Sequence, residues 1–305
     1  MKPKVVIILG PTGVGKSEVA MSVAVHVQGE IVSADSLQIY RHMDVGTGKP
    51  APEQRREVRH HLIDMIDPDR EFNAAMFREM ALKAIQEIRS RRNQAIVCGG
   101  TGLYIKVLIH GLFVGPGRDA GIRKDLEEEA KERGLGCLYE RLKQIDPDVT
   151  SWIHPNDRQR IIRALEVFTL TGKRMSEWQG DHGFGESSFE SLKIGLNRDR
   201  EELYGLIDRR CEEMVVGGLI EEVKWLAENG YGMDLKPLQS VGYNHIGLYL
   251  RGEMGLEESL ALMKRDTRRL AKRQLTWFRA DKEIRWFHPE HERKKILDTA
   301  RDFLQ

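Results

Sequence analysis

The glycine-rich stretch Gly10–Ser17 constrains the fold of this chain more than any other segment. It reads GPTGVGKS and matches the pattern G-x-x-x-x-G-K-[ST] in full. The apolar run Val5–Leu9 precedes it, and Ser17–Val27 follows with apolar residues at helical spacing. Glycines allow successive backbone N–H groups to point at phosphate oxygens, and the following helix adds its positive N-terminal end. The sequence therefore predicts a strand, a phosphate-binding loop and a helix.

Each residue type in this loop has an expected role. The lysine reaches the outer phosphate, and the serine hydroxyl is placed to hold Mg²⁺. The predicted phosphate-binding residues are Gly10, Pro11, Thr12, Gly13, Val14, Gly15, Lys16 and Ser17, with Ser17 as the predicted metal ligand.

The rest of the chain alternates between strand-like and helical segments. Three further apolar runs predict buried strands at Glu30–Ala34, Gln94–Cys98 and Leu192–Leu196, and Ala74–Ser90 is helical in its spacing. Strands separated by helices indicate an α/β fold with a doubly wound parallel sheet. Residues 116–189 are helical and charged without a convincing buried strand. We therefore expect a P-loop α/β core with C-terminal helices, formed by residues 1–115 and 190–305, and a helical insertion domain at 116–189.

Composition restricts the class of protein. Hydrophobic residues make up 40% of the chain and charged residues 31%, and no apolar run has the length of a membrane span. The apolar run near the N-terminus is too short for a signal peptide. Three scattered cysteines fit neither a disulfide framework nor a metal site, which indicates the reduced cytoplasm. We expect a cytoplasmic protein without a membrane partner, and a monomer because no segment indicates an obligate interface.

A carboxylate follows the second predicted strand. Asp35 lies at its carboxyl end, where ligands bind in open α/β sheets. It could act as a general base, support a bound metal, or cap a helix. Gln38 could offer a donor and an acceptor to the edge of a base. The strand Gln94–Cys98 leads into Gly99–Tyr104 instead of the acid that hydrolytic P-loop enzymes use, which disfavours a motor or a switch GTPase.

A basic segment lies near the C-terminus. Residues 258–285 contain nine lysines and arginines against four acidic residues, whereas the whole chain has a net charge of +1. On a helix, Arg265, Arg269 and Lys272 would share one side and could follow a phosphate backbone. The alternative is a solvated helix face.

Several blocks of sequence resemble one family. They are DSLQIYRHMDVGTGKP (35–50), HHLID (60–64), GGTGLY (99–104), HPNDRQRIIRALEV (154–167), TGKRMS (171–176), SVGY (240–243) and AKRQLTWFR (271–279). Together with the phosphate loop, and in this order, they are similar to the bacterial tRNA dimethylallyltransferases over nearly the whole chain.

The resemblance implies a Mg²⁺-dependent transfer of a dimethylallyl group from dimethylallyl diphosphate to N6 of an adenosine beside the tRNA anticodon. The phosphate loop would then hold diphosphate instead of a nucleoside triphosphate. Asp35 would be the general base, and Thr101 and Arg210 would complete the catalytic set, although the adjacent Arg209 leaves the choice of arginine open. The implied contacts to the tRNA anticodon stem-loop are Asp35, Ser36, Leu37, Gln38, Thr101, Arg123, Gln159, Arg160, Ile161, Ile162 and Arg163.

Two other functions remain as alternatives. A nucleotide kinase, or a prenyltransferase that acts on free AMP, would share the phosphate loop, but neither needs the long insertion or the basic segment. A non-catalytic RNA-binding module would have no reason to place the anion of Asp35 beside a phosphate site. Salt dependence separates the first alternative, because tRNA binding weakens steeply with salt and AMP binding far less.

Overall fold

The chain forms two compact units. The computed structural model describes residues 2–111, 115–182 and 188–305. One unit comprises Met1–Ile109 together with Ser188–Gln305, and the other comprises His110–Ser187. The second unit is thus an insertion between two parts of the first.

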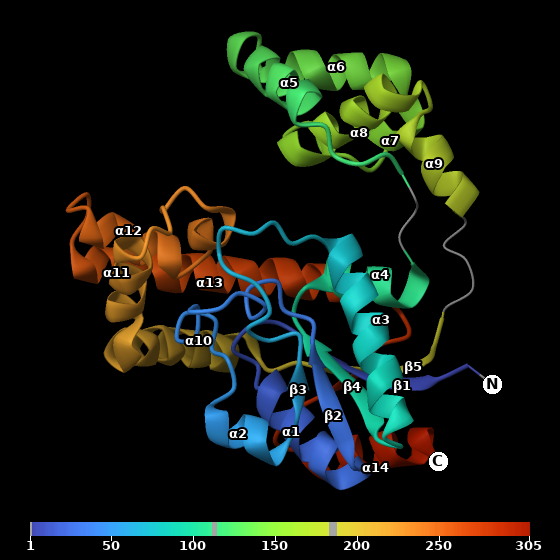
Figure 1. Ribbon diagram of the computed structural model, residues 1–305, viewed down its shortest axis with the longest axis vertical. Helices are drawn as coiled ribbons and strands as arrows, with labels where there is room; N and C mark the ends of the chain where they lie inside the picture. Colours follow the sequence, from blue (N-terminus) through green and yellow to red (C-terminus); the bar gives the residue numbers. More distant parts are fainter. Residues whose placement is uncertain (1, 112–114, 183–187) are drawn as a thin grey trace. The chain divides into compact units, whose positions relative to one another are not determined.

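The larger unit contains a six-stranded sheet in the order β3-β2-β4-β1-β5-β6, and every pair of neighbouring strands is parallel (Figure 1). The predicted α/β fold with a doubly wound parallel sheet is confirmed. The four predicted strands correspond to the four longest in the sheet, and the two short edge strands were not predicted. The strands are β1 (Lys4–Leu9), β2 (Gly29–Ser33), β3 (His60–His61), β4 (Gln94–Gly99), β5 (Glu190–Leu196) and β6 (Arg285–Phe287).

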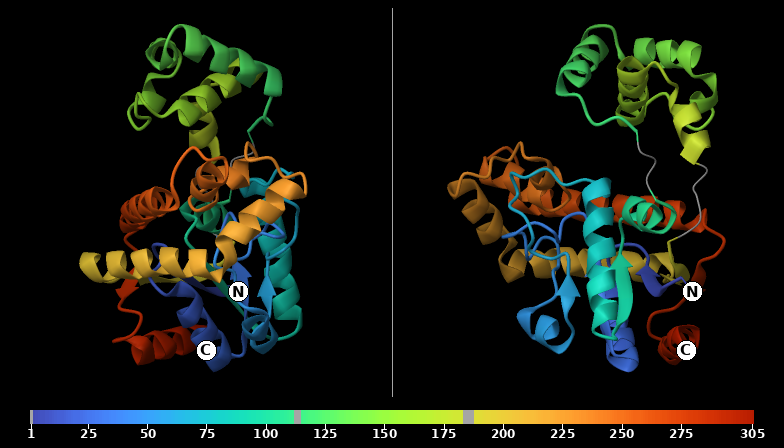
Figure 2. Two further views of the ribbon diagram at one scale, coloured as in Figure 1. Left: turned by 90° about the vertical axis from the view of Figure 1, so that its left-hand side faces the viewer. Right: turned by 45° about the vertical axis from the view of Figure 1, so that its right-hand side comes forward.

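Helices cover both faces of this sheet. The connections β1 to β2 and β3 to β4 run in opposite directions along the sheet, so right-handed crossovers place their helices on opposite faces. Accordingly α1 (Lys16–Val27) packs with α14 (Arg293–Leu304) on one face, and α3 (Ala74–Ser90) packs on the other. The left view of Figure 2 shows the sheet between them. The short helices α2 (Pro52–Glu57) and α4 (Gly102–His110) complete this part.

The C-terminal helices pack against one another beside the sheet. They are α10 (Arg200–Met214), a π-helical turn (Val215–Leu219), α11 (Ile220–Glu228), a 3₁₀ turn (Lys236–Gln239), α12 (Tyr243–Leu250) and α13 (Leu256–Arg279). Gly218 has a φ of 100°, and this left-handed residue kinks the chain between α10 and α11. The long helix α13 buries one side, including Met263, Ala271 and Phe278, and passes near the carboxyl ends of the strands (Figure 1).

The smaller unit is a helical bundle with its own core. Its helices are α5 (Ala120–Glu132), α6 (Leu135–Ile145), α7 (Pro147–Thr150), α8 (Arg158–Thr171) and α9 (Met175–His182). Asp119 and Asp157 cap α5 and α8, because their carboxylates accept hydrogen bonds from backbone N–H groups in the first turn. Leu138, Leu142 and Ile161 are fully buried at its centre. Across the described parts of both units, no helix combines the length and the apolarity that crossing a membrane requires.

Candidate active site at the carboxyl edge of the sheet

Three loops meet where β1, β2 and β4 end. These strands are neighbours in the sheet, so the segments that follow them share one edge. The Ala34 N–H donates to the Cys98 carbonyl at 2.8 Å, and the Thr101 N–H donates to the Ala34 carbonyl at 3.3 Å. A Cβ at Gly99 would overlap the backbone of Ala34. Glycine at this position therefore allows the ends of β2 and β4 to approach closely.

The phosphate loop has the conformation that its sequence predicts. Gly13 and Gly15 have φ values of 80° and 99°, and Gly15 immediately precedes α1. The Lys16 ammonium lies back against the loop and donates to the Pro11 carbonyl at 2.7 Å. Ser17 is exposed in the first turn of α1. The loop amides, the ammonium and the hydroxyl thus lie at one helix N-terminus, an arrangement suited to an anion.

Burial changes the proton affinity of Lys16. Desolvation lowers its pKa to about 8, and Arg210 also lowers it, while Cys98 and Asp35 oppose the change. Desolvation raises the pKa of the Cys98 thiol to about 11. Lys16, Asp35 and Arg210 are therefore close enough to interact electrostatically, with two cations and one carboxylate at the same edge.

Of the two candidate arginines, only Arg210 faces this edge. Burial lowers its pKa, and the charge of Asp35 opposes that change, whereas Arg209 is exposed. A Cβ at Gly48, where φ is 58°, would overlap the Arg210 guanidinium, so the loop around Gly48 packs closely on it. Among the described residues Arg210 has no hydrogen bond or ion pair. A half-buried guanidinium without such a partner is suited to bind an anion.

Asp35 is not a helix cap. Its carboxylate accepts a hydrogen bond from the Leu37 N–H at 2.9 Å, but no helix begins there. This local turn fixes the side chain and leaves the carboxylate partly exposed at the sheet edge. The neighbouring Ser36 N–H donates to the Thr101 hydroxyl oxygen at 3.2 Å. Asp35 and Ser36, which follow β2, therefore lie beside Thr101, which follows β4.

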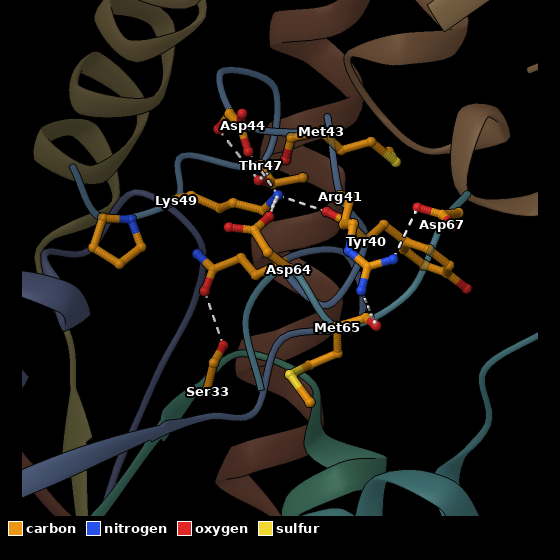
Figure 3. Close-up of polar contacts among 12 residues, drawn as sticks. Ser33, Tyr40, Arg41, Met43, Asp44, Thr47, Lys49, Asp64, Met65 and Asp67 are labelled. Carbon is orange, nitrogen blue, oxygen red and sulfur yellow. Dashed lines mark hydrogen bonds and ion pairs between the residues drawn. The ribbon is translucent and has the colours of Figure 1, made fainter. Parts of the chain in front are cut away.

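The segment 38–49 is held by polar contacts within the chain (Figure 3). The Ser33 hydroxyl donates to the Gln38 side-chain oxygen at 2.8 Å, so the amide predicted to bind a base is already fixed within the chain. Lys49, whose side chain is 1% exposed, donates to the Tyr40 carbonyl at 2.5 Å, to Asp44 at 2.7 Å and to Asp64 at 2.5 Å. This ammonium joins both ends of the segment and ties it to Asp64.

Glu222 on α11 holds the same segment, and sequence reasoning missed it. Its carboxylate accepts from the N–H groups of Asp44, Val45 and Gly46 at 2.8, 2.7 and 3.1 Å. The buried Tyr243 hydroxyl donates to it at 2.6 Å. Nothing in the local sequence indicates this role, because its partners lie about 180 residues earlier in the chain.

Several cations of the basic helix α13 have partners within the chain. Arg265 and Arg269 both contact Asp266, while Arg268 pairs with Asp208 at 3.1 Å, and Lys264 pairs with Glu212. The predicted stripe is therefore partly neutralised. Lys272, which is exposed, has no ion pair in the part of the chain that the structure describes.

The remaining predicted residues belong to the helical unit. Glu166, which is fully buried, accepts from Arg123 at 3.0 Å and from Arg163 at 2.8 Å. The side chains of Ile161 and Ile162 lie in the core of this unit. Gln159 and Arg160 are exposed at the N-terminal end of α8.

No cluster of three metal-ligating side chains occurs among the described residues. Mg²⁺ binds phosphate oxygens readily and retains several waters, so it needs few protein ligands. The exposed Ser17 hydroxyl at the phosphate loop fits such a metal, which the diphosphate of a substrate would hold in large part.

Comparison with known proteins places the chain in a family. A profile of the IPP transferase family matches residues 38–281. The tRNA dimethylallyltransferase of Geobacter sulfurreducens is 50% identical over 285 residues, covering 93% of this chain and 92% of the relative. The tRNA dimethylallyltransferase 2 of Syntrophus aciditrophicus is 47% identical over 304 residues, covering 100% and 97%.

Two solved structures are also similar to this chain over nearly its full length. The tRNA isopentenylpyrophosphate transferase of Bacillus halodurans is 40% identical, with a TM-score of 0.73 over 99% of this chain and 95% of that one. A eukaryotic dimethylallyltransferase acting on tRNA is 26% identical, with a TM-score of 0.82 over 99% and 79%. With this similarity over almost its full length, the chain belongs to the IPP transferase family.

Proposed function

We propose that this protein transfers a dimethylallyl group from dimethylallyl diphosphate to N6 of an adenosine beside the anticodon of tRNA, releasing diphosphate. The observation that carries the proposal is the pairing of a phosphate loop with the carboxylate of Asp35 at one sheet edge, where β4 ends in glycines and not in a hydrolytic acid. It is a tRNA dimethylallyltransferase, as its relatives are named. A tRNA substrate implies the cytoplasm.

The acceptor is activated by Asp35. The N6 amine of adenine is a weak nucleophile because its lone pair is delocalised into the ring. A carboxylate that takes its proton as the C–N bond forms contributes about 10²–10⁴ in rate. The hydrogen bond from the Leu37 N–H to the Asp35 carboxylate supports this role, because it fixes the carboxylate. Thr101 would orient the acceptor base, since its hydroxyl accepts from Ser36 and keeps its own proton to donate.

The leaving group is stabilised by cations that are already in place. Negative charge develops on the diphosphate as the C–O bond breaks, and preorganised donors stabilise that charge best. Lys16, the loop amides and Arg210 are such donors. Mg²⁺ held by Ser17 and the diphosphate would neutralise further charge.

The tRNA must present an extruded adenosine, because N6 cannot reach a protein carboxylate from within a base stack. Ser36, Leu37 and Gln38 are proposed to line the pocket for this base. In the helical unit, Arg123, Arg163 and the exposed Gln159 and Arg160 are proposed to contact the tRNA, whereas Ile161 and Ile162 would support them from the core.

The test is transfer of labelled dimethylallyl diphosphate with Mg²⁺ to unmodified tRNA or to AMP. We expect label in tRNA alone. Asp35→Asn should lower kcat by about 10²–10⁴ while the Kd for tRNA stays within about twofold. Label in AMP would indicate a nucleotide acceptor. Turnover of the variant near that of the wild type would remove Asp35 as the base.

A further inference from the structure

The side-chain amide of Gln274 joins two of the three loops at the site. Gln274 lies on α13, and its Oε1 accepts a hydrogen bond from the Thr12 N–H of the phosphate loop at 2.8 Å. Its Nε2 donates to the Gly100 carbonyl, just after β4, at 3.0 Å. One side chain therefore connects the loop that binds phosphate with the loop that carries Thr101.

The contact between α13 and this second loop is tight. A Cβ at Gly100 would lie 2.5 Å from Nε2 of Gln274, and a Cβ at Gly102 would overlap the indole of Trp277. Gln274 and Trp277 are three residues apart and share one side of the helix. Both glycines leave room for these side chains, so α13 packs closely against the loop.

The connection extends to the catalytic carboxylate. Thr101 follows Gly100, and its hydroxyl accepts from the N–H of Ser36, the residue after Asp35. Gln274 thus contacts the diphosphate side of the site directly and the acceptor side through Thr101. We propose that Gln274 is a positioning residue that sets the separation between the diphosphate and the acceptor base. This inference rests on the proposed function.

The reaction requires such control. The nucleophilic nitrogen and the carbon that it attacks must approach to about 3–3.5 Å, and a displacement of about 1 Å can cost about 10²-fold in rate. A neutral amide suits this position because it offers one acceptor to Thr12 and one donor to Gly100. Glutamate would keep the first bond but place a carboxylate oxygen against the Gly100 carbonyl. Methionine has a similar length and makes neither bond.

We would measure Gln274→Glu and Gln274→Met against Thr276→Ala, an exposed position on the same helix. For each protein, kcat at saturating substrates, the Kd for tRNA and the Tm are compared with the wild type. We expect kcat to fall about 10- to 100-fold in both Gln274 variants, with the Kd for tRNA within about twofold and Thr276→Ala unchanged. Gln274→Glu loses the bond to Gly100 and adds a negative charge beside the phosphate loop, whereas Gln274→Met loses both bonds without adding charge.

The outcomes separate the two proposals. If the wild type is active and both Gln274 variants have the same kcat as the wild type, the positioning role is overturned and the proposed function is not. A parallel loss of kcat, tRNA affinity and Tm would also overturn it, because Gln274 would then only stabilise the fold. Absence of transfer by the wild type and by Thr276→Ala would overturn the proposed function, and this inference with it.

Discussion

We expect Lys16 to make diphosphate binding depend on pH, because burial lowers the pKa of its ammonium. Its pKa is lowered by burial from 10.5 to about 8, so the ammonium is charged below about pH 8 and neutral above it. Only the charged form attracts a diphosphate. We therefore expect kcat/KM for dimethylallyl diphosphate to be high near neutral pH and to fall as the pH rises through about 8.

The size of the effect follows from the titration. With a pKa of about 8, the protonated fraction falls from about 90% near pH 7 to about 10% near pH 9. If the neutral form does not bind, kcat/KM falls about tenfold over this interval. In Lys16→Arg the cation stays protonated throughout, because the guanidinium pKa is far higher. Its kcat/KM would be lower overall, but it would lack this tenfold decline.

Initial rates at saturating tRNA measure this quantity between about pH 6.5 and 9.5. Lys83→Arg on α3 is the matched control, since this exposed lysine lies away from the loop and its replacement should keep the wild-type profile. A wild-type kcat/KM that does not decline above pH 8 would refute the reasoning. A decline of the same size in Lys16→Arg would assign the titration to another group.

Two further predictions concern buried carboxylates. Glu166→Gln removes the charge that holds Arg123 and Arg163. We expect the Kd for tRNA, measured by filter binding, to rise several-fold, while the KM for dimethylallyl diphosphate stays unchanged. An unaltered tRNA affinity would mean that this cluster is purely structural. Glu30→Ala should lower the free energy of unfolding by about 3–5 kcal/mol in urea titrations, because it breaks a buried ion pair. It should leave kcat intact, because Glu30 lies toward the amino end of β2, away from the site. Burial alone would raise the pKa of Glu30, but hydrogen bonds from Arg91, Asn93 and His61 lower it to about 2. The stability that Glu30 contributes is therefore full above about pH 4.5 and is lost as the pH falls toward 2. A loss of kcat or an unchanged free energy of unfolding in the variant would contradict this structural role.

Local sequence predicted the parts of the fold that local physics determines. The phosphate loop needs glycines at particular backbone angles, so its motif and its geometry coincide at Gly13 and Gly15. The long strands are continuous apolar runs because both faces of the sheet are covered. The edge strand β3 has only His60 and His61, which is too short for any periodicity.

Contacts between distant segments were beyond prediction. Glu222 and Gln274 organise loops about 180 and 260 residues away, and neither belongs to a motif that states a mechanism. The charge count over the basic segment left out distant partners for the same reason. A count over residues 258–285 does not include Asp208 and Glu212 on α10, which neutralise Arg268 and Lys264.

The charges left at the sheet edge differ from those of the basic helix. Lys264 and Arg268 have carboxylate partners, whereas Lys16 and Arg210 form no ion pair among the described residues and interact electrostatically with the nearby Asp35. Burial disfavours the charged form of both of these cations. A buried cation without a full partner destabilises the folded chain. An anion that binds at this edge would offset the cost of these poorly paired cations. That offset would contribute to the free energy of anion binding. Asp35, the carboxylate near both cations, would then interact with them less strongly. It would be available to accept the proton of the incoming amine.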